Sequence, residues 1–236
     1  MSPRPYELLV FDWDGTLIDS IGTIVACTQA TLNELQLPPL PEQSIRQTIG
    51  LGLKETLETL LPDADRALAE RVREVYFQHW VTTYCNQPLL FPDIEPLLTG
   101  LAEAGYVMAV ATGKSRRGLE RDMNRIGLRE LFATTRTVDE AHSKPHPQML
   151  LDVLDDLGVR AEDALMIGDT THDLRMAEAA RVAAVAVAGG SQPRSILEEL
   201  APLACLDTVH QLPEWLHERR PGAKDPAAAD QPATSS

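Results

Sequence analysis

The sequence predicts an α/β protein in which helices cover a parallel sheet and an all-helical unit is inserted after the first strand. Short β-like runs alternate with helical patterns along most of the 236 residues, and this alternation is typical of parallel sheets. One interval, residues 20–92, contains no convincing strand and breaks the alternation. Together the two observations predict a sheet core with one helical insertion.

Five short β-like runs are the expected main strands. They cover residues 7–11, 106–111, 133–138, 164–167 and 182–187, and Cys205 and Leu206 are expected to start a short edge strand. Helical patterns follow most of these runs, at residues 114–126, 147–157, 170–180 and 193–200. Such helices supply the crossovers that parallel neighbours require.

The insertion is expected to be helical because apolar residues recur in it at spacings of three and four. The first stripe includes Ile21, Val25 and Leu32, and the second includes Val72 and Trp80. We therefore predict a catalytic core formed by residues 1–19 and 92–217 and a helical cap formed by residues 20–91. Residues 218–236 are rich in Pro, Ala, Asp and Ser, and we expect them to be disordered.

Composition excludes several classes of function. The 21 basic residues against 35 acidic ones give a formal charge of −14, which argues against nucleic-acid binding. The three cysteines show no paired spacing that indicates a disulfide framework or a zinc site. No run approaches the roughly 20 apolar residues of a membrane helix. We expect a cytoplasmic protein without nucleic-acid or membrane partners, and the sequence leaves its oligomeric state open.

The strongest chemical signal is the segment Phe-Asp-Trp-Asp-Gly-Thr-Leu, which directly follows the first expected strand. Asp12 and Asp14 are two residues apart and can face one site, and ligands of open parallel sheets bind beyond the carboxyl ends of strands. One carboxylate can attack phosphorus while the other exchanges protons with the leaving oxygen and with water. The alternative, a turn that only caps a helix, is weakened by the strand before it and the Gly-Thr after it.

Three further polar segments follow later strands. Thr112 and the backbone N–H of Gly113 are suitable donors to a phosphoryl oxygen, and the ammonium of Lys144 can offset the charge of such a group and of Asp12. Asp169 follows the fourth expected strand and can reach the first loop, where carboxylate oxygens form a site suited to magnesium. Each segment alone is open to a structural reading as a cap or a surface turn.

The four segments, in this order, resemble the haloacid dehalogenase superfamily, and the helical insertion resembles the cap of its phosphoglycolate phosphatase-like subgroup. The resemblance covers the chain to about residue 217 and implies a Rossmann-like core. It implies a phosphatase that acts on a small phosphorylated metabolite through an aspartyl-phosphate, with Asp12 as nucleophile and Asp14 as general acid and base. Thr112, Gly113 and Lys144 then bind the transferring phosphoryl group.

The resemblance also implies a magnesium ion. Its ligands would be the Asp12 carboxylate, the Asp14 backbone carbonyl and Asp169. Asp173 would support these ligands without itself contacting the ion. The cap is expected to close over the substrate and to determine specificity near residues 50–54 and along Arg46. His172 is expected to have a solvated or capping role. Trp13 is expected to pack in the core, with the alternative that it faces the pocket between the two aspartates.

Several related activities remain open. Phosphoryl transfer like that of β-phosphoglucomutase and hydrolysis of inorganic pyrophosphate are compatible with the same motifs. A phosphonate-cleaving enzyme would place a Schiff-base lysine in the cap, where Lys54 lies, but that branch resembles this sequence less at Asp14. A dehalogenase is disfavoured for the same reason. A non-catalytic binding module on this fold is the alternative from another class, and competent side chains at every catalytic position argue against it.

Overall fold

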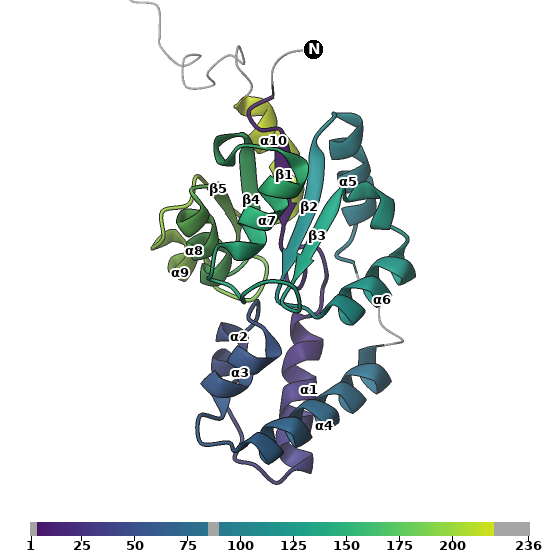
Figure 1. The fold of residues 1–236 in the computed structure, drawn as a ribbon, viewed down its shortest axis with the longest axis vertical. Coiled ribbons are helices and arrows are strands. Elements are labelled where there is room, and N and C mark those ends of the chain that lie inside the picture. Colours follow the sequence, from purple (N-terminus) through teal and green to yellow (C-terminus); the bar gives the residue numbers. More distant parts are fainter. Residues whose placement is uncertain (1–3, 85–89, 220–236) are drawn as a thin grey trace, which may run out of the picture.

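The computed structural model of the chain describes residues 4–84 and 90–219. Figure 1 shows two parts, a sheet flanked by helices and a group of helices beyond one end of the sheet. Residues 220–236 of the predicted disordered tail lie outside the described residues, whereas Glu218, its expected first residue, belongs to the last helix. Among the described residues, no helix combines the length and the apolar character needed to cross a membrane.

One sheet of six parallel strands forms the core, in the order β3-β2-β1-β4-β5-β6. The strands are β1 (Leu8–Phe11), β2 (Val107–Thr112), β3 (Thr134–Thr137), β4 (Ala164–Gly168), β5 (Ala183–Val187) and β6 (Cys205–Leu206). They confirm the predicted α/β fold class, and their ends differ from the expected ranges by no more than a residue. The central position of β1 places its carboxyl end between those of β2 and β4.

Both faces of the central strands are buried, which explains why β1 and β4 are continuous apolar runs. The edge strand β3 is polar and buries alternate residues. Alternate side chains of β1 belong to different hydrophobic clusters, because successive residues of a strand point to opposite faces. Leu9 and Phe11 pack with α5 (Ile94–Glu103), α6 (Arg116–Ile126) and α10 (Leu212–Glu218). Leu8 and Val10 pack with α7 (Gln148–Leu157) and α8 (Thr171–Ala180). A short helix, α9 (Arg194–Glu198), contacts α8 and β6.

The insertion consists of α1 (Ile21–Glu34), α2 (Glu42–Gln47), α3 (Leu53–Leu60) and α4 (Arg66–Tyr84). Figure 1 shows these helices beyond the carboxyl ends of the strands, with α1 and α4 packed against each other. An antiparallel bridge between Ile18 and Leu90 pairs the two segments that lead into and out of the insertion. The exact division at residues 20 and 91 stays a prediction, although all four helices fall inside it.

Some helices differ from the expected ranges. Helix α6 starts at Arg116 because Ser115 is its N-cap, with a side chain that accepts a hydrogen bond from the Gly118 N–H. Helix α8 starts after Thr170 for the same reason. The sequence patterns did not predict α5 or α10, nor the short 3-10 turns at Arg129–Leu131, Ala161–Asp163 and Val209–Gln211.

Candidate active site

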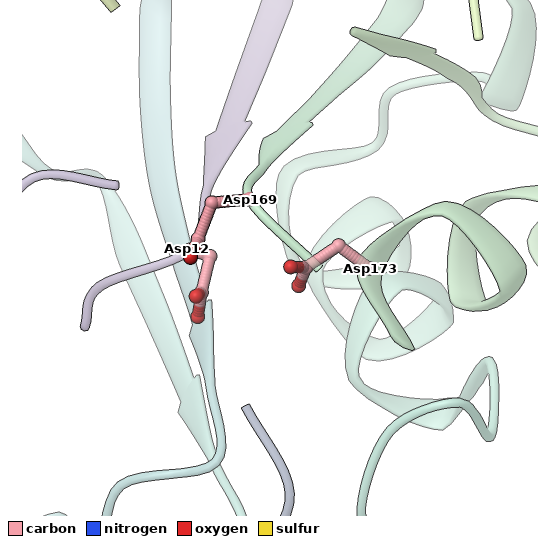
Figure 2. A group of neighbouring side chains, drawn as sticks. All are labelled: Asp12, Asp169 and Asp173. Atoms are coloured by element: carbon pink, nitrogen blue, oxygen red, sulfur yellow. The ribbon is translucent and has the colours of Figure 1, made fainter. Parts of the chain in front are cut away.

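Three carboxylates meet at the carboxyl ends of the central strands. Asp12 follows β1, Asp169 follows β4, and Asp173 lies in the first turn of α8. One oxygen from each lies within 4.8 Å of the others, and all three side chains are buried. Figure 2 shows Asp12 and Asp169 side by side, with the carboxylate of Asp173 facing them. The parallel register brings residues from distant parts of the sequence to one point, as the sequence predicts for Asp12 and Asp169.

Lys144 lies between two of these carboxylates. Its ammonium donates to Asp12 Oδ1 at 2.6 Å and to Asp173 Oδ1 at 2.6 Å. The lysine is 1% exposed, so water does not screen either ion pair. The other oxygen of Asp173 accepts from the N–H and the hydroxyl of Thr170 in a capping box. Asp173 therefore anchors Lys144 beside Asp12.

Asp169 is held by hydrogen bonds to both of its oxygens. The Thr16 hydroxyl donates to Oδ1 at 2.9 Å, and the Ser191 N–H donates to Oδ2 at 2.6 Å. Gly15 has a φ of +92°, and a Cβ at Gly15 or at Gly190 would collide with the Asp169 carboxylate. The Asp14-Gly15-Thr16 motif signals part of this arrangement, but nothing in the sequence marked Ser191.

Burial dominates the electrostatics of the cluster. It raises the pKa of Asp12 well above its ordinary value; Lys144 opposes this rise, and the neighbouring Asp173 and Asp169 add to it. The pKa of Asp169 is raised to about 6 by burial and by Asp173, against the opposing hydrogen bonds from Ser191 and Thr16. Burial lowers the pKa of Lys144, but Asp12 and Asp173 outweigh it and leave the pKa raised. The site thus favours an additional positive charge.

The donor set fits a small divalent cation. Asp12 Oδ2 is buried and has no hydrogen-bond partner among the described residues, and an unpartnered buried carboxylate oxygen is costly. The three carboxylates outnumber the single ammonium of Lys144, and oxygen ligands of this kind suit magnesium. Both oxygens of Asp169 and of Asp173 accept hydrogen bonds from the protein, and of these two residues Asp173 is the one paired with the Lys144 ammonium. The supporting place expected for Asp173 stays a prediction.

The remaining predicted residues line the same edge of the sheet. The Asp14 carboxylate accepts from the Ser20 hydroxyl at 2.7 Å and from Lys114. The Thr112 oxygen accepts from the Lys114 N–H at 3.1 Å, which leaves the hydroxyl proton available for another acceptor. Gly113 lies directly under the insertion, because a Cβ there would collide with the backbone carbonyls of Gly50 and Leu51.

The insertion covers the site through backbone contacts. The Gly52 N–H donates to Ser143 Oγ at 2.8 Å, next to Lys144. His172 Nε2 lies 2.9 Å from the Gln47 carbonyl oxygen, so this histidine contacts the insertion, in addition to lying in the first turn of α8. Its expected solvated or capping role stays a prediction, and the sequence contains no signal for this contact between residues so far apart.

Two residues of the insertion that the sequence analysis singled out form ion pairs with neighbouring glutamates. The Lys54 side chain is 79% exposed and its ammonium is 3.8 Å from Glu58, which gives no support to a Schiff-base role in phosphonate cleavage. Arg46, expected to contribute to specificity, pairs with Glu42 at 2.7 Å. Trp13 is fully buried and contacts Phe132 edge-on, as predicted for a packing residue.

Comparison with known proteins places the chain in one family. A family model described as haloacid dehalogenase-like hydrolase matches residues 9–187. A Dickeya dadantii protein named "Probable phosphatase IndB" is 34% identical over 209 residues, which cover 87% of this chain and 91% of that protein. A phosphoglycolate phosphatase from Colwellia psychrerythraea is 28% identical over 220 residues, which cover 90% and 97% of the two chains.

Solved structures agree with this placement. A haloacid dehalogenase-like hydrolase from Bacteroides fragilis superposes with a TM-score of 0.80 at 29% identity, over 88% of this chain and 99% of that one. A hydrolase from Pseudomonas syringae gives a TM-score of 0.79 at 24% identity, over 88% of this chain and 96% of that one, and supports the fold alone. The matches span both the sheet and the helical insertion.

Proposed function

The chain belongs to the haloacid dehalogenase-like hydrolases, and from that premise we propose that it is a magnesium-dependent phosphatase that forms an aspartyl-phosphate on Asp12. The observation that carries this proposal is the buried carboxylate of Asp12, with one oxygen bound to Lys144 and the other without a hydrogen-bond partner in the described part of the chain. A nucleophile needs such an uncommitted oxygen, and a negative site needs cations before it can accept a phosphate.

In the first half-reaction, an oxygen of Asp12 attacks phosphorus and the bond from phosphorus to the leaving oxygen breaks. Asp14 donates a proton to that oxygen, so that an alcohol leaves instead of an alkoxide. In the second half-reaction, Asp14 takes a proton from water, the water oxygen attacks phosphorus, and Asp12 is regenerated with release of inorganic phosphate. The two aspartates thus have different tasks in one cycle.

The other groups orient the phosphoryl group and offset its charge. Lys144 holds Asp12 in place and lies within reach of a phosphoryl oxygen bound at that carboxylate. The Thr112 hydroxyl and the Gly113 N–H are the other proposed donors. Magnesium, held by Asp12, the Asp14 carbonyl and Asp169, would supply positive charge that offsets the repulsion between the phosphate and the carboxylates. The insertion keeps bulk water away while the aspartyl-phosphate exists.

The substrate is proposed to be a small phosphate monoester of the phosphoglycolate type. Relatives named phosphoglycolate phosphatase match over most of their length, at 25–29% identity. Small size is also favoured by the close approach of Gly50 and Leu51 to Gly113, which leaves little room between the insertion and the sheet.

Phosphate release from a panel of metabolites tests the proposal. The panel contains phosphoglycolate, pyrophosphate, hexose phosphates and a generic aryl phosphate, each assayed with magnesium and with excess chelator. We expect magnesium-dependent release, with phosphoglycolate among the best substrates. Release that persists in chelator would contradict the metal requirement, and no release from any member would contradict the phosphatase itself.

A further inference from the structure

A second buried lysine lies at the site, and it contacts Asp14 instead of Asp12. The Lys114 ammonium donates to both carboxylate oxygens of Asp14, at 2.8 and 3.0 Å. The lysine side chain is only 9% exposed, and that of Asp14 is 13% exposed. Ser20 adds a hydrogen bond to Oδ1. The orientation of the Asp14 carboxylate is therefore fixed by three donated hydrogen bonds from two directions.

Lys114 is itself anchored by both parts of the molecule. On the core side, its ammonium lies 3.3 Å from Asp122 Oδ2 in α6. That oxygen also accepts from the Trp13 indole N–H at 3.4 Å, and Asp122 Oδ1 pairs with Arg121. On the insertion side, the ammonium lies 4.8 Å from the ring centre of Trp80 in α4, which is a cation–π distance.

The carboxylates around Lys114 favour the charged form of its side chain. Burial lowers the pKa of Lys114, but Asp14 and Asp122 outweigh that effect and leave the pKa raised. Replacing a buried ion pair by apolar packing is often neutral or stabilising, and in some proteins such pairs serve to fix one arrangement. The arrangement fixed here is that of Asp14 relative to Asp12.

We propose that Lys114 is a positioning residue that holds Asp14 within reach of the leaving oxygen when Trp80 of the insertion is in place. The inference rests on the proposed function, because it assigns Lys114 a task only through Asp14 as general acid and base. Lys114 exchanges no proton and touches neither phosphorus nor the leaving group. Trp80 and Asp122 determine where the ammonium lies, so a closed insertion and a correctly aimed Asp14 occur together.

The leaving group supplies the test. An aryl phosphate has a leaving oxygen that needs little protonation, whereas an alkyl phosphate such as phosphoglycolate depends on the general acid. We expect Lys114→Met to lower kcat for the alkyl ester by roughly 10²-fold, within the usual range for general acid catalysis, and for the aryl ester much less. Lys114→Arg, which keeps a cation, should recover part of the loss. Arg73→Met removes an exposed cation from α4, the helix that carries Trp80, and should leave both rates unchanged.

A second comparison remains valid if Lys114→Met alone does not fold. Asp14→Asn removes the group that Lys114 positions, so adding Lys114→Met to it should cause no further loss of kcat. Equal losses for both esters, a further loss in the Asp14→Asn background, or a loss confined to KM would overturn the inference. The last result would mean that Lys114 binds substrate directly. Absence of turnover in the wild-type protein would instead overturn the proposed function, and this inference with it.

Discussion

Asp12 is a carboxylate that the chain only partly neutralises. Lys144 donates to one oxygen, the other has no hydrogen-bond partner within residues 4–84 and 90–219, and burial raises the pKa of the side chain. A protonated carboxylic acid is a poor nucleophile, so the proposed chemistry requires further positive charge next to Asp12. Asp169 lies at the end of the adjacent strand, β4, and is a proposed magnesium ligand. It is therefore the residue at which the need for a metal ion can be tested most directly.

The pKa of Asp169 leads to a prediction about pH and stability. Its folded-state pKa of about 6 lies above the ordinary 3.8, so the folded protein binds the proton more tightly than the unfolded chain. This group therefore makes the metal-free protein less stable as pH rises through that window, by at most about 3 kcal/mol. In chelator, we expect Asp169→Asn to melt above wild type at pH 7, with a difference that shrinks towards pH 5.

Magnesium should reverse this order at pH 7. Binding to the folded state alone raises the melting temperature by mass action, and the gain should appear in wild type and be much smaller in Asp169→Asn. Thermal melts with chelator and with magnesium measure both effects. A difference between the two proteins that is the same at pH 5 and pH 7 in chelator would show that Asp169 does not titrate as described.

The sequence could predict which polar residues lie at strand ends, but not which groups the long side chains contact after folding. Asp12 and Asp169 follow apolar runs, and parallel pairing brings such positions together. The contacts of Lys114 depend on where Trp80 and Asp122 lie after folding. The contact of His172 with the Gln47 carbonyl depends on the placement of the insertion. No local pattern encodes that placement.

At the scale of elements, the loop between α2 and α3 closes the site by packing on the loop after β2. The carbonyls of Gly50 and Leu51 lie where a side chain at position 113 would begin. Glycine at position 113 is therefore required for this close approach. Its role is steric, in addition to the proposed donation from its backbone N–H to the phosphoryl group.

This contact makes a prediction for Gly113→Ala. The added methyl group should push the loop away, weaken closure and lower kcat/KM by about 10²-fold, the scale of a misplacement near 1 Å. The melting temperature should change little, because the site contributes little apolar packing. Gly100→Ala is the matched control, since a Cβ there meets nothing within 4 Å. Equal kinetics for both variants would contradict the steric role of Gly113.

Element boundaries were predictable where a capping residue or an apolar run marks them. The strands are examples, and the observed range of α8 differs from the expected one only in its N-cap residue, Thr170. Helix α5 was missed because Pro96 and Gly100 both lower helix propensity. Pro96, however, lies in the first turn, where a missing N–H has no intrahelical partner to lose. Packing of Leu98 and Leu101 against the sheet stabilises the rest of the helix.

For the molecule as a whole, the described arrangement is closed. Asp12, Lys144 and Asp169 are each no more than 1% exposed, so a substrate can reach them only if the insertion moves. The paired segments at Ile18 and Leu90 are where such a motion would pivot, because they connect the two parts. The closed site is consistent with chemistry that excludes bulk water.

The central claim is that phosphate is transferred to Asp12 before it reaches water. The most direct measurement is mass spectrometry of peptides from acid-quenched protein after mixing with magnesium and phosphoglycolate. We expect a phosphoryl adduct on Asp12 in wild type and in Asp19→Asn, which alters an exposed aspartate nearby. Asp12→Asn should show no adduct and no turnover. Multiple turnovers by Asp12→Asn, or an adduct on another residue, would contradict the account.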